Sequence, residues 1–467
     1  MCVNMSTLSS AQAFADFQFS GAALGDARRA KRLVRVAAAL AQKPCGTLHG
    51  AILDWAEVQA AYRLLADEET TLDSVTAPHR KKVFEACAAA QEVLLIEDTT
   101  SLNYSTLKNV KDMGWIGDDE ACKGFNLHST LALRIENWNS NQEPELTMLG
   151  LFGIHCWTRT HSKRGRGKEK KSARLRRERE SQRWAAVLGT REGPPAGSRW
   201  TFMGDREADI YEVFQDCRGA GMDWIVRANQ PRALEDEGGS VFSAVAQASR
   251  LGQYTLKLRA RPNQKRRKAK LEVRALSVTL RGPQRPGGRL EPETMNVIEV
   301  REVNPPAGTE AIHWVLLTSW PIGNLSQVLR VVKSYTRRWL IEEYHKALKS
   351  GVGVEDSQLT SARSLQALIG ILAVVALRLL SLKLLNRTQP DEPVSKAEIG
   401  PEALMLLEKA YRKPKGGWTN GTVLTTIARM GGFLARKGDG SPGWKMIWQG
   451  WHRLMTMVEG VRLLLGH

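Results

Sequence analysis

Apolar and polar positions divide the chain into a helical beginning, a middle rich in strands and a helical end. Residues 1–70 read as wholly helical, with a helix start at Asp26 and a second helix over 55–66. After another helix near 77–90, continuous or alternating apolar runs predict strands. These runs lie at 93–96, 127–135, 146–158, 200–204, 224–227 and 314–318. The first three suggest an antiparallel start to a sheet, and the whole pattern predicts an α/β fold.

Residues 233–310 differ from their surroundings because Gly and Pro interrupt alternating, strand-like runs. This pattern predicts a β-rich insertion with a basic hairpin at 259–270. From residue 365 the chain is helical again, and 390–393 reads as a linker. The last helix carries an apolar stripe, which either packs on its own domain or mediates self-association. The stripe consists of Trp444, Ile447, Trp448, Trp451, Leu454, Met455 and Val458.

Residues 335–349 contain no Gly or Pro and predict one helix with two unlike faces. One face is apolar, and the other combines a tyrosine and a carboxylate with several cations. The polar stripe consists of Tyr335, Arg338, Glu342, Lys346 and Lys349, with Glu342 in its middle and Glu343 at its edge. A solvated face with a Glu342–Lys346 pair is the simpler interpretation. A carboxylate among cations also suits a metal ligand beside a bound phosphate.

Two of the predicted strands lead into acidic residues that suit an active site. Glu97 and Asp98 follow the first strand, and because neighbouring side chains point to opposite faces, only one of them can serve the same site. Asp205, Glu207 and Asp209 follow the strand near residue 200. The alternatives are a turn residue at Asp98 and acids that cap a helix after the second strand. The strand pattern alone leaves these alternatives open.

The chain is strongly basic, with 67 Lys and Arg against 49 Asp and Glu and a formal net charge of +18. This excess favours a polyanionic partner, of which nucleic acid is the usual one and an anionic membrane surface the alternative. The first predicted helix carries Arg28, Arg29, Lys31 and Arg32, which either contact DNA phosphates and groove edges or form a solvated face. Residues 159–183 hold twelve Lys or Arg against three acids, and they form either a solvated loop or a DNA-backbone contact.

We expect a cytoplasmic protein. The first residues lack a basic region followed by a long apolar run, so no secretory signal is expected. The most apolar segment, 367–385, contains Arg378 and Lys383, and its charge-free part is too short for a bilayer, so it reads as a buried helix. The six cysteines are scattered without paired spacing, which fits free thiols in a reducing compartment and argues against a zinc site.

The spacing Tyr335-x2-Arg338-x3-Glu342-x6-Lys349 resembles the Y-x2-R-x3-E-x6-K signature of bacterial cut-and-paste transposases of the Tn5 type, in the IS4 group. In that family the Glu completes an Asp-Asp-Glu metal-binding triad. The resemblance implies that Asp98, in an E-D-T-T context, and Asp205, the first residue of a D-R-E-A-D run, are the other members. It implies further that a tryptophan at position 314 stacks on a base flipped out of the duplex. The residues expected to contact DNA are Arg28, Arg29, Arg32, Arg227, Trp314, Tyr335, Arg338, Lys346 and Lys349.

The resemblance also implies a domain plan, namely a ribonuclease-H-like catalytic core with a β-rich insertion, flanked by helical N- and C-terminal domains. The expected domains are a DNA-binding domain at 1–70, a catalytic domain at 71–390 with its insertion at about 233–310, and a dimerisation domain at 391–467. Two Mg²⁺ ions per active site are expected on Asp98, Asp205 and Glu342, with Mn²⁺ as a substitute.

The implied activity is cut-and-paste transposition through strand nicking, hairpin formation and strand transfer. The implied partners are double-stranded DNA, both as inverted repeats at the transposon ends and as target, and a second copy of the chain in a paired-end homodimer; no membrane is expected. Two other classes remain. One is a nuclease or integrase-like enzyme with the same triad, and the other is a DNA-binding protein that has lost catalysis, which the intact triad and the basic first helix argue against.

Overall fold

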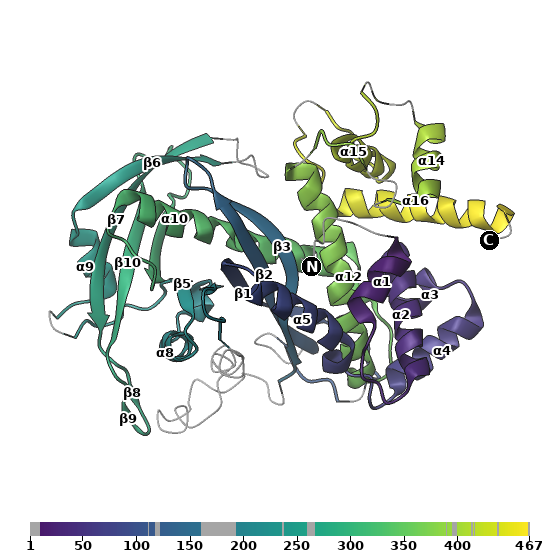
Figure 1. The fold of residues 1–467 in the computed structure, drawn as a ribbon, viewed down its shortest axis with the longest axis horizontal. Coiled ribbons are helices and arrows are strands. Elements are labelled where there is room, and N and C mark those ends of the chain that lie inside the picture. Colours follow the sequence, from purple (N-terminus) through teal and green to yellow (C-terminus); the bar gives the residue numbers. More distant parts are fainter. Residues whose placement is uncertain are drawn as a thin grey trace.

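One large sheet forms the centre of the fold. The computed structural model describes residues 10–110, 112–116, 122–159, 193–235, 238–258, 267–388, 390–394, 399–411, 414, 416–436 and 439–465. Its main strands are β1 (Glu92–Asn103), β2 (Gly124–Trp138), β3 (Pro144–Trp157), β4 (Arg199–Gly204), β5 (Asp223–Arg227), β6 (Arg250–Leu258), β7 (Arg267–Leu280), β10 (Glu293–Glu302) and β11 (His313–Thr318). Within these residues they form a nine-stranded sheet in the order β3-β2-β1-β4-β5-β11-β10-β7-β6 (Figure 1). The α/β class predicted from the sequence is confirmed.

The central strands fix where acidic residues meet. β1 pairs antiparallel with β2 and parallel with β4, and β4 pairs parallel with β5. The apolar runs of β1 and β4 are buried because helices cover the sheet, as their unbroken apolar sequences predict. The last register pair between β1 and β4 joins Ile96 to Met203. Residues that follow these two positions therefore lie at the same level of the sheet.

The predicted β-rich insertion is part of the central sheet. Helix α9 (Val241–Gln247) and the strands β6, β7 and β10 occupy this region, together with a small hairpin of β8 (Gln284–Arg285) and β9 (Gly288–Arg289). β10 pairs antiparallel with both β7 and β11, so the segment extends the sheet from its core strand β11. The sequence predicts these strands, but it does not predict that they join the same sheet.

Helices from both ends of the chain meet on one long central helix, α12 (Ala362–Thr388) (Figure 1). The first group is α1 (Ala11–Phe19), α2 (Ala27–Gln42), α3 (Leu48–Ala51), α4 (Trp55–Ala66) and α5 (Leu72–Ala88). The last group is α14 (Pro401–Ala410), α15 (Asn420–Met430) and α16 (Trp444–Leu465). α12 contacts α2, α4, α5 and α15. The predicted start at Asp26 is confirmed, because its carboxylate accepts a hydrogen bond from the Arg28 backbone N–H at 2.7 Å.

α12 also contains the segment that is most similar to a membrane span. By length and composition, Ala362–Ser381 is the one helical stretch of the described residues that suffices to cross a bilayer. In the structure 94 % of its most apolar window is buried inside the protein. It is therefore the buried core helix that its apolar sequence predicts.

The helix predicted over 335–349 consists of several helical segments of different pitch. α10 (Leu325–Tyr335) leads into a short 3₁₀ turn, η3 (Thr336–Arg338), before α11 (Trp339–Lys346) and a π turn, η4 (Ala347–Gly351). The Thr336 hydroxyl donates to the Lys333 carbonyl at 2.6 Å, a local bond that favours a tightened turn. η4, the wider turn that follows α11, packs against α12 and α16, so tertiary contacts accompany this change of pitch.

Two basic segments predicted from the sequence lie outside the described residues. These are the segment 159–183, apart from Arg159, and positions 259–266 of the predicted hairpin.

Candidate active site

Asp98 lies inside β1, whereas the sequence predicted a strand end at this point. The strand continues to Asn103 because β2 pairs with it along its whole length, with Asp98 opposite Ser129. Parallel pairing with β4 stops two residues before Asp98. One oxygen of the Asp98 carboxylate accepts a hydrogen bond from the Thr99 backbone N–H at 2.8 Å. The side chain is thus held by its own strand at the level where β4 ends.

Asp205 follows β4 directly and reaches the same level. It caps the short 3₁₀ turn η2 (Arg206–Ala208), where its Oδ1 accepts the Glu207 backbone N–H at 2.8 Å. Because Ile96 and Met203 are register partners, positions 98 and 205 each lie two residues beyond the pair. Asp98 and Asp205 therefore come together where the parallel pairing of β1 with β4 stops, next to the carboxyl end of β4, a position where side chains commonly form active sites.

Glu342 reaches this pair of aspartates from α11. The Arg338 guanidinium connects the groups, with Nη1 at 3.5 Å from Asp98 Oδ2 and Nη2 hydrogen-bonded to Glu342 Oε1. The Glu342 side chain is 45 % exposed, against 18 % for Asp98 and 17 % for Arg338. The site therefore opens to solvent at Glu342 and is closed beneath Asp98.

The charges of Asp205 and Glu342 both affect the ionisation of Asp98. Burial, and next the negative charge of Asp205, raise the pKa of Asp98 from its usual 3.8 to about 6. Glu342 acts in the same direction, while Arg338 and the Thr99 hydrogen bond oppose the rise. The three residues that the sequence predicted to converge therefore interact, although 107 and 137 residues separate them along the chain.

The donor set fits a hard divalent cation. Three carboxylates supply only oxygen ligands, the type that Mg²⁺ prefers, and a bound cation would relieve the repulsion that raises the pKa of Asp98. Among the described residues no group of three or more His, Cys, Asp or Glu side chains is close enough to enclose an ion. Arg338 bridges Asp98 and Glu342, so ion binding between these two requires the guanidinium to withdraw.

A cationic and aromatic group adjoins the carboxylates. The Trp314 and Tyr335 ring centroids lie 6.0 Å apart in an edge-to-face arrangement, and Trp314 is half-buried. Arg227 donates to the His313 carbonyl at 3.0 Å. Burial raises the pKa of Tyr335, which the nearby charges of Arg338 and Arg227 partly oppose. The predicted DNA contacts of this group therefore lie together beside the carboxylates, and the charge of Asp205 also acts on the pKa of Tyr335. They are Arg227, Trp314, Tyr335 and Arg338.

The two lysines predicted as DNA contacts occupy different surroundings. Lys346 lies on the Glu343 side of α11, with Nζ at 3.4 Å from Glu343 Oε1, so the simple Glu342–Lys346 pair considered from the sequence is not formed. Lys349 is half-buried in η4. It adds to the burial that lowers the pKa of His345 to about 3. The charge of Lys349 therefore acts on His345, which is buried in α11, whereas Lys346 is exposed and pairs with Glu343.

The basic residues of α2 divide into paired and unpaired ones. Arg29 forms an ion pair with Asp67 at 2.7 Å, and Arg32 pairs with Glu57 of α4. Arg28 and Lys31 are exposed and have no ion-pair partner among the described residues. Two of the predicted DNA contacts thus also stabilise the helical domain itself.

Residues behind the site were not predicted from the sequence. Glu97 is buried on the opposite face of β1 from Asp98, where its carboxylate contacts His128 Nε2 and the Thr130 hydroxyl, both at 2.9 Å. His128 Nδ1 lies 2.9 Å from the Thr99 hydroxyl. In the sequence, only the alternation of side chains along the strand indicated that Glu97 and Asp98 serve different sites. The structure agrees, because the two side chains lie on opposite faces of β1. This network supports the strand that carries Asp98.

Asp209 also has a structural role. It is buried and accepts hydrogen bonds from the backbone N–H groups of Asn229 and Gln230 and from Arg232 Nε, at 2.7–2.8 Å. These bonds fix the loop that follows β5. The interpretation of Asp209 as a supporting residue rather than a ligand agrees with these contacts.

Three protein-family models match the chain in order along its length. They are described as transposase DNA-binding, over residues 11–70, transposase DDE domain, over 197–378, and transposase Tn5 dimerisation domain, over 374–466. The chain belongs to the Tn5-like, IS4-family DDE transposases. This DDE transposase is an enzyme that cleaves and joins DNA, and its catalytic domain implies a ribonuclease-H-like core. Asp205 and Glu342 lie within the DDE match, and Asp98 precedes it.

Comparison with solved structures matches the transposase to a piggyBac transposase in a synaptic complex with hairpin DNA. The two chains share 8 % sequence identity with a TM-score of 0.33, and the comparison covers 98 % of this chain and 79 % of the other. A similarity at this level has no bearing on the site. The three family matches are sufficient to identify a DNA-binding protein that forms dimers and belongs to a metal-using class of enzymes.

Proposed function

We propose that this transposase performs cut-and-paste transposition by nicking a transposon end, forming a DNA hairpin and transferring the freed end to target DNA. The observation that carries the proposal is the meeting of Asp98, Asp205 and Glu342 where the pairing of β1 with β4 stops, with Arg338 between two of them. Such a group of carboxylates suits phosphoryl transfer, in which most of the catalysis comes from positioning and charge stabilisation.

The three carboxylates would hold the metal. Two Mg²⁺ ions, with Mn²⁺ as a substitute, would when bound activate the nucleophile and stabilise the leaving oxygen. Arg338 lies close enough to hold the scissile phosphate once it releases the carboxylates, and a guanidinium binds phosphate in two-pronged fashion. Arg227, Tyr335 and Lys349 would hold the neighbouring phosphates, and Lys346 would contact DNA from the exposed side of α11.

DNA binding and assembly involve the outer helices. Arg28, Arg29 and Arg32 would contact the transposon end, and the last two would exchange Asp67 and Glu57 for DNA phosphate. The proposed domains are 1–70 for end binding, 71–390 for catalysis with the sheet extension at about 233–310, and 391–467 for assembly of a paired-end homodimer. The proposed setting is the bacterial cytoplasm, with the protein associated with the nucleoid when it is bound to DNA and without a membrane.

The deciding experiment uses purified full-length protein, Mg²⁺, a target plasmid and labelled duplexes from the inverted repeats that bracket the gene. Transposition predicts nicked ends, then hairpins, then labelled target. Cleavage without labelled target would instead identify a nuclease with the same triad. Binding without cleavage in either Mg²⁺ or Mn²⁺ would identify a DNA-binding protein that has lost catalysis.

A further inference from the structure

Glu343 follows Glu342 in α11, and it contacts residues from two distant helices. Its Oε2 lies 2.6 Å from Nζ of Lys383 in α12 and accepts a hydrogen bond from Trp444 Nε1 at 3.0 Å. Trp444 is the first residue of α16, in the C-terminal group of helices. One carboxylate oxygen therefore joins the helix of the active site to the core helix and to the last helix of the chain.

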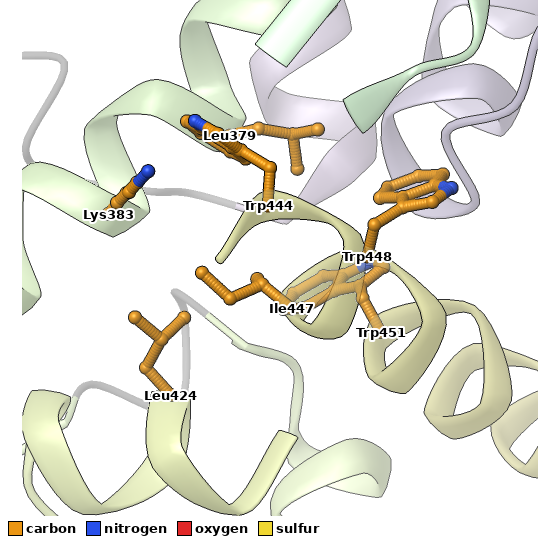
Figure 2. A pocket seen from close by; sticks show the side chains of 7 residues that line it. All are labelled: Leu379, Lys383, Leu424, Trp444, Ile447, Trp448 and Trp451. Atoms are coloured by element: carbon orange, nitrogen blue, oxygen red, sulfur yellow. The ribbon is translucent and has the colours of Figure 1, made fainter. Parts of the chain in front are cut away.

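These contacts are largely shielded from water. The Lys383 side chain is 7 % exposed and that of Glu343 is 13 % exposed. Lys383 Nζ also lies 4.1 Å from the centroid of the Trp444 ring, as a cation over an aromatic face. Figure 2 shows Lys383 and Trp444 side by side at the edge of a pocket lined by residues of α12, α15 and α16. Because a buried charge without its partner is costly, each of the three residues depends on the other two.

The backbone next to α11 is shaped to receive Trp444. Gly351 ends the π turn η4, and a Cβ at this position would lie 3.9 Å from Trp444 Cε3 and 3.2 Å from Leu379 Cδ1. The ring therefore packs directly over the turn that follows α11. The start of α16 is held both by this close approach and by the polar contacts to Glu343.

α11 is short and lies between turns of different pitch. It spans eight residues, with the 3₁₀ turn η3 before it and the π turn η4 after it. In a helix, neighbouring side chains point about 100° apart, so the contact that holds Glu343 also sets the direction of Glu342. Arg338 binds Glu342 on the active-site side. The helix is therefore anchored on two sides, once at the active site and once at the C-terminal helices.

We propose that Glu343, Lys383 and Trp444 form a clamp through which docking of the C-terminal helices positions the catalytic carboxylate Glu342. This inference rests on the proposed metal-dependent nicking. In it Glu343 and Trp444 are positioning residues that act through α11 and touch neither DNA nor metal. The C-terminal helices then contribute to the chemical step in addition to any part they play in pairing two copies of the chain.

Conservative variants of the full-length protein test the clamp. Trp444→Phe removes the indole N–H and retains an aromatic ring, and Lys383→Met removes the charge and retains the length. Trp451→Phe is the matched control, because Trp451 is a buried tryptophan of the same helix whose Nε1 has no partner among the described residues. Thermal unfolding and gel shifts with end DNA first establish that each variant folds and assembles.

The first measurement is hydrogen exchange of the α11 amides, which requires no activity. Trp444→Phe and Lys383→Met should accelerate exchange in α11 by about tenfold, although neither residue belongs to that helix, and Trp451→Phe should leave it unchanged. Unchanged exchange in α11 for the first two variants overturns the clamp. If the wild-type chain does not nick DNA, the proposed function fails, and the exchange result still decides whether α16 and α11 are coupled.

The second measurement is single-turnover nicking in preassembled paired-end complexes. Trp444→Phe and Lys383→Met should slow nicking by about tenfold with unchanged complex formation, and higher Mg²⁺ should restore part of the loss. The control variant should stay within about twofold of the wild type. A loss that follows only the fraction of assembled complex, or that is equal in the control, contradicts positioning and indicates a purely structural contact.

Discussion

At the scale of single residues, two neighbouring glutamates of α11 have different partners. Glu342 contacts Arg338 beside the aspartates, and Glu343 contacts Lys383 and Trp444. We expect Glu342→Ala to slow Mg²⁺-dependent nicking by about a thousandfold or more, because a methyl group cannot bind the metal, while end binding remains measurable. Glu343→Ala should remain at least about a hundredfold more active. Nicking assays and gel shifts check this, and equal losses in the two variants would disprove the assignment.

The ionisation of Asp98 predicts a pH-dependent cost to folding. Its pKa is raised to about 6 in the folded protein from a usual 3.8, so between these values the folded protein binds more protons than the unfolded chain. The stability that the protonated carboxyl contributes is fully present below pH 3.8, and it is lost as the pH rises through about 6. Asp98→Asn should therefore be more stable than the wild type above about pH 6, by at most about 3 kcal/mol.

Thermal unfolding between pH 3.5 and 8 measures this effect without DNA. The advantage of Asp98→Asn should become small toward pH 3.5, where the wild-type carboxyl is neutral in the folded protein and mostly neutral in the unfolded chain. At pH 8, Mg²⁺ should stabilise the wild type and not the variant, because ion binding to the folded state favours folding. An advantage that persists at pH 3.5 would mean that packing, and not charge, distinguishes the two proteins.

Trp314 supports a prediction about one step of the reaction. Its half-buried ring lies edge-to-face with Tyr335, beside the carboxylates. A hairpin requires an unstacked base, and stacking on an aromatic ring stabilises such a base by ~1–3 kcal/mol. Trp314→Ala should therefore retain nicking and slow hairpin formation by about tenfold for each 1.4 kcal/mol lost. A labelled-end assay should show nicked DNA accumulating, and Trp314→Phe should restore most of the rate. A parallel loss of both steps would make Trp314 a core residue.

At the scale of elements, the local sequence pattern predicts which segments form strands and helices. It does not predict where each element ends, because neighbouring elements help to set its length. The apolar run of β1 is evident in the sequence, yet the strand passes through Asp98 to Asn103 because β2 supplies a partner. Similarly, 335–349 has helical periodicity throughout, yet it contains a π turn, η4, which packs against α12 and α16. Both departures depend on residues far away in the chain, which no local signal contains.

For the apolar stripe of α16, the sequence left open whether it packs on its own domain or mediates self-association. Trp451, Leu454, Met455 and Val458 are buried against residues of α14 and α15, so this half of the stripe packs on its own group of helices. Deleting the chain from about residue 440 would therefore disrupt this core as well as any interface. Among the side chains of α16 whose burial is described, the exposed large apolar ones are Met457, Leu463 and Leu464, at 41 %, 71 % and 88 %.

These exposed residues allow a sharper test of dimer formation than truncation. We expect the double variant Leu463→Glu/Leu464→Glu to weaken dimer formation by about tenfold or more, because buried apolar area stabilises interfaces and two charges oppose burial. Single-end binding should be retained, and paired-end cleavage should fall. Light scattering of the DNA-free and end-bound protein measures the assembly state. Dimers of wild-type strength in this variant would place the interface elsewhere.

At the scale of the whole molecule, folding brings together what the sequence separates. Spacing and resemblance predict Asp98, Asp205 and Glu342 individually, and the register of β1 with β4 accounts for the meeting of the first two. Glu342 lies on α11, which packs against α12, and the following turn η4 packs against α12 and α16. This arrangement could not be predicted from the sequence, because it is determined by long-range packing between segments that have no shared local pattern.

The net charge of +18 is also a property of the whole molecule, and it predicts how DNA binding responds to salt. Each phosphate that the protein neutralises adds about −0.9 to the slope of log K against log salt. Arg28→Ala and Lys31→Ala should each reduce the slope by about this amount, since both side chains are exposed cations without an ion-pair partner in the described residues. Arg29→Ala should weaken the helical domain as well, because Arg29 pairs with Asp67.

Arg301→Ala, an exposed cation of β10, is the control and should leave the slope unchanged. Fluorescence anisotropy with labelled end DNA between 50 and 300 mM salt, the range in which counterion release dominates, measures all four slopes. A nearly flat titration of the wild type would remove DNA as the reason for the charge, and an equal reduction in the control would show that the charge acts diffusely and not through α2.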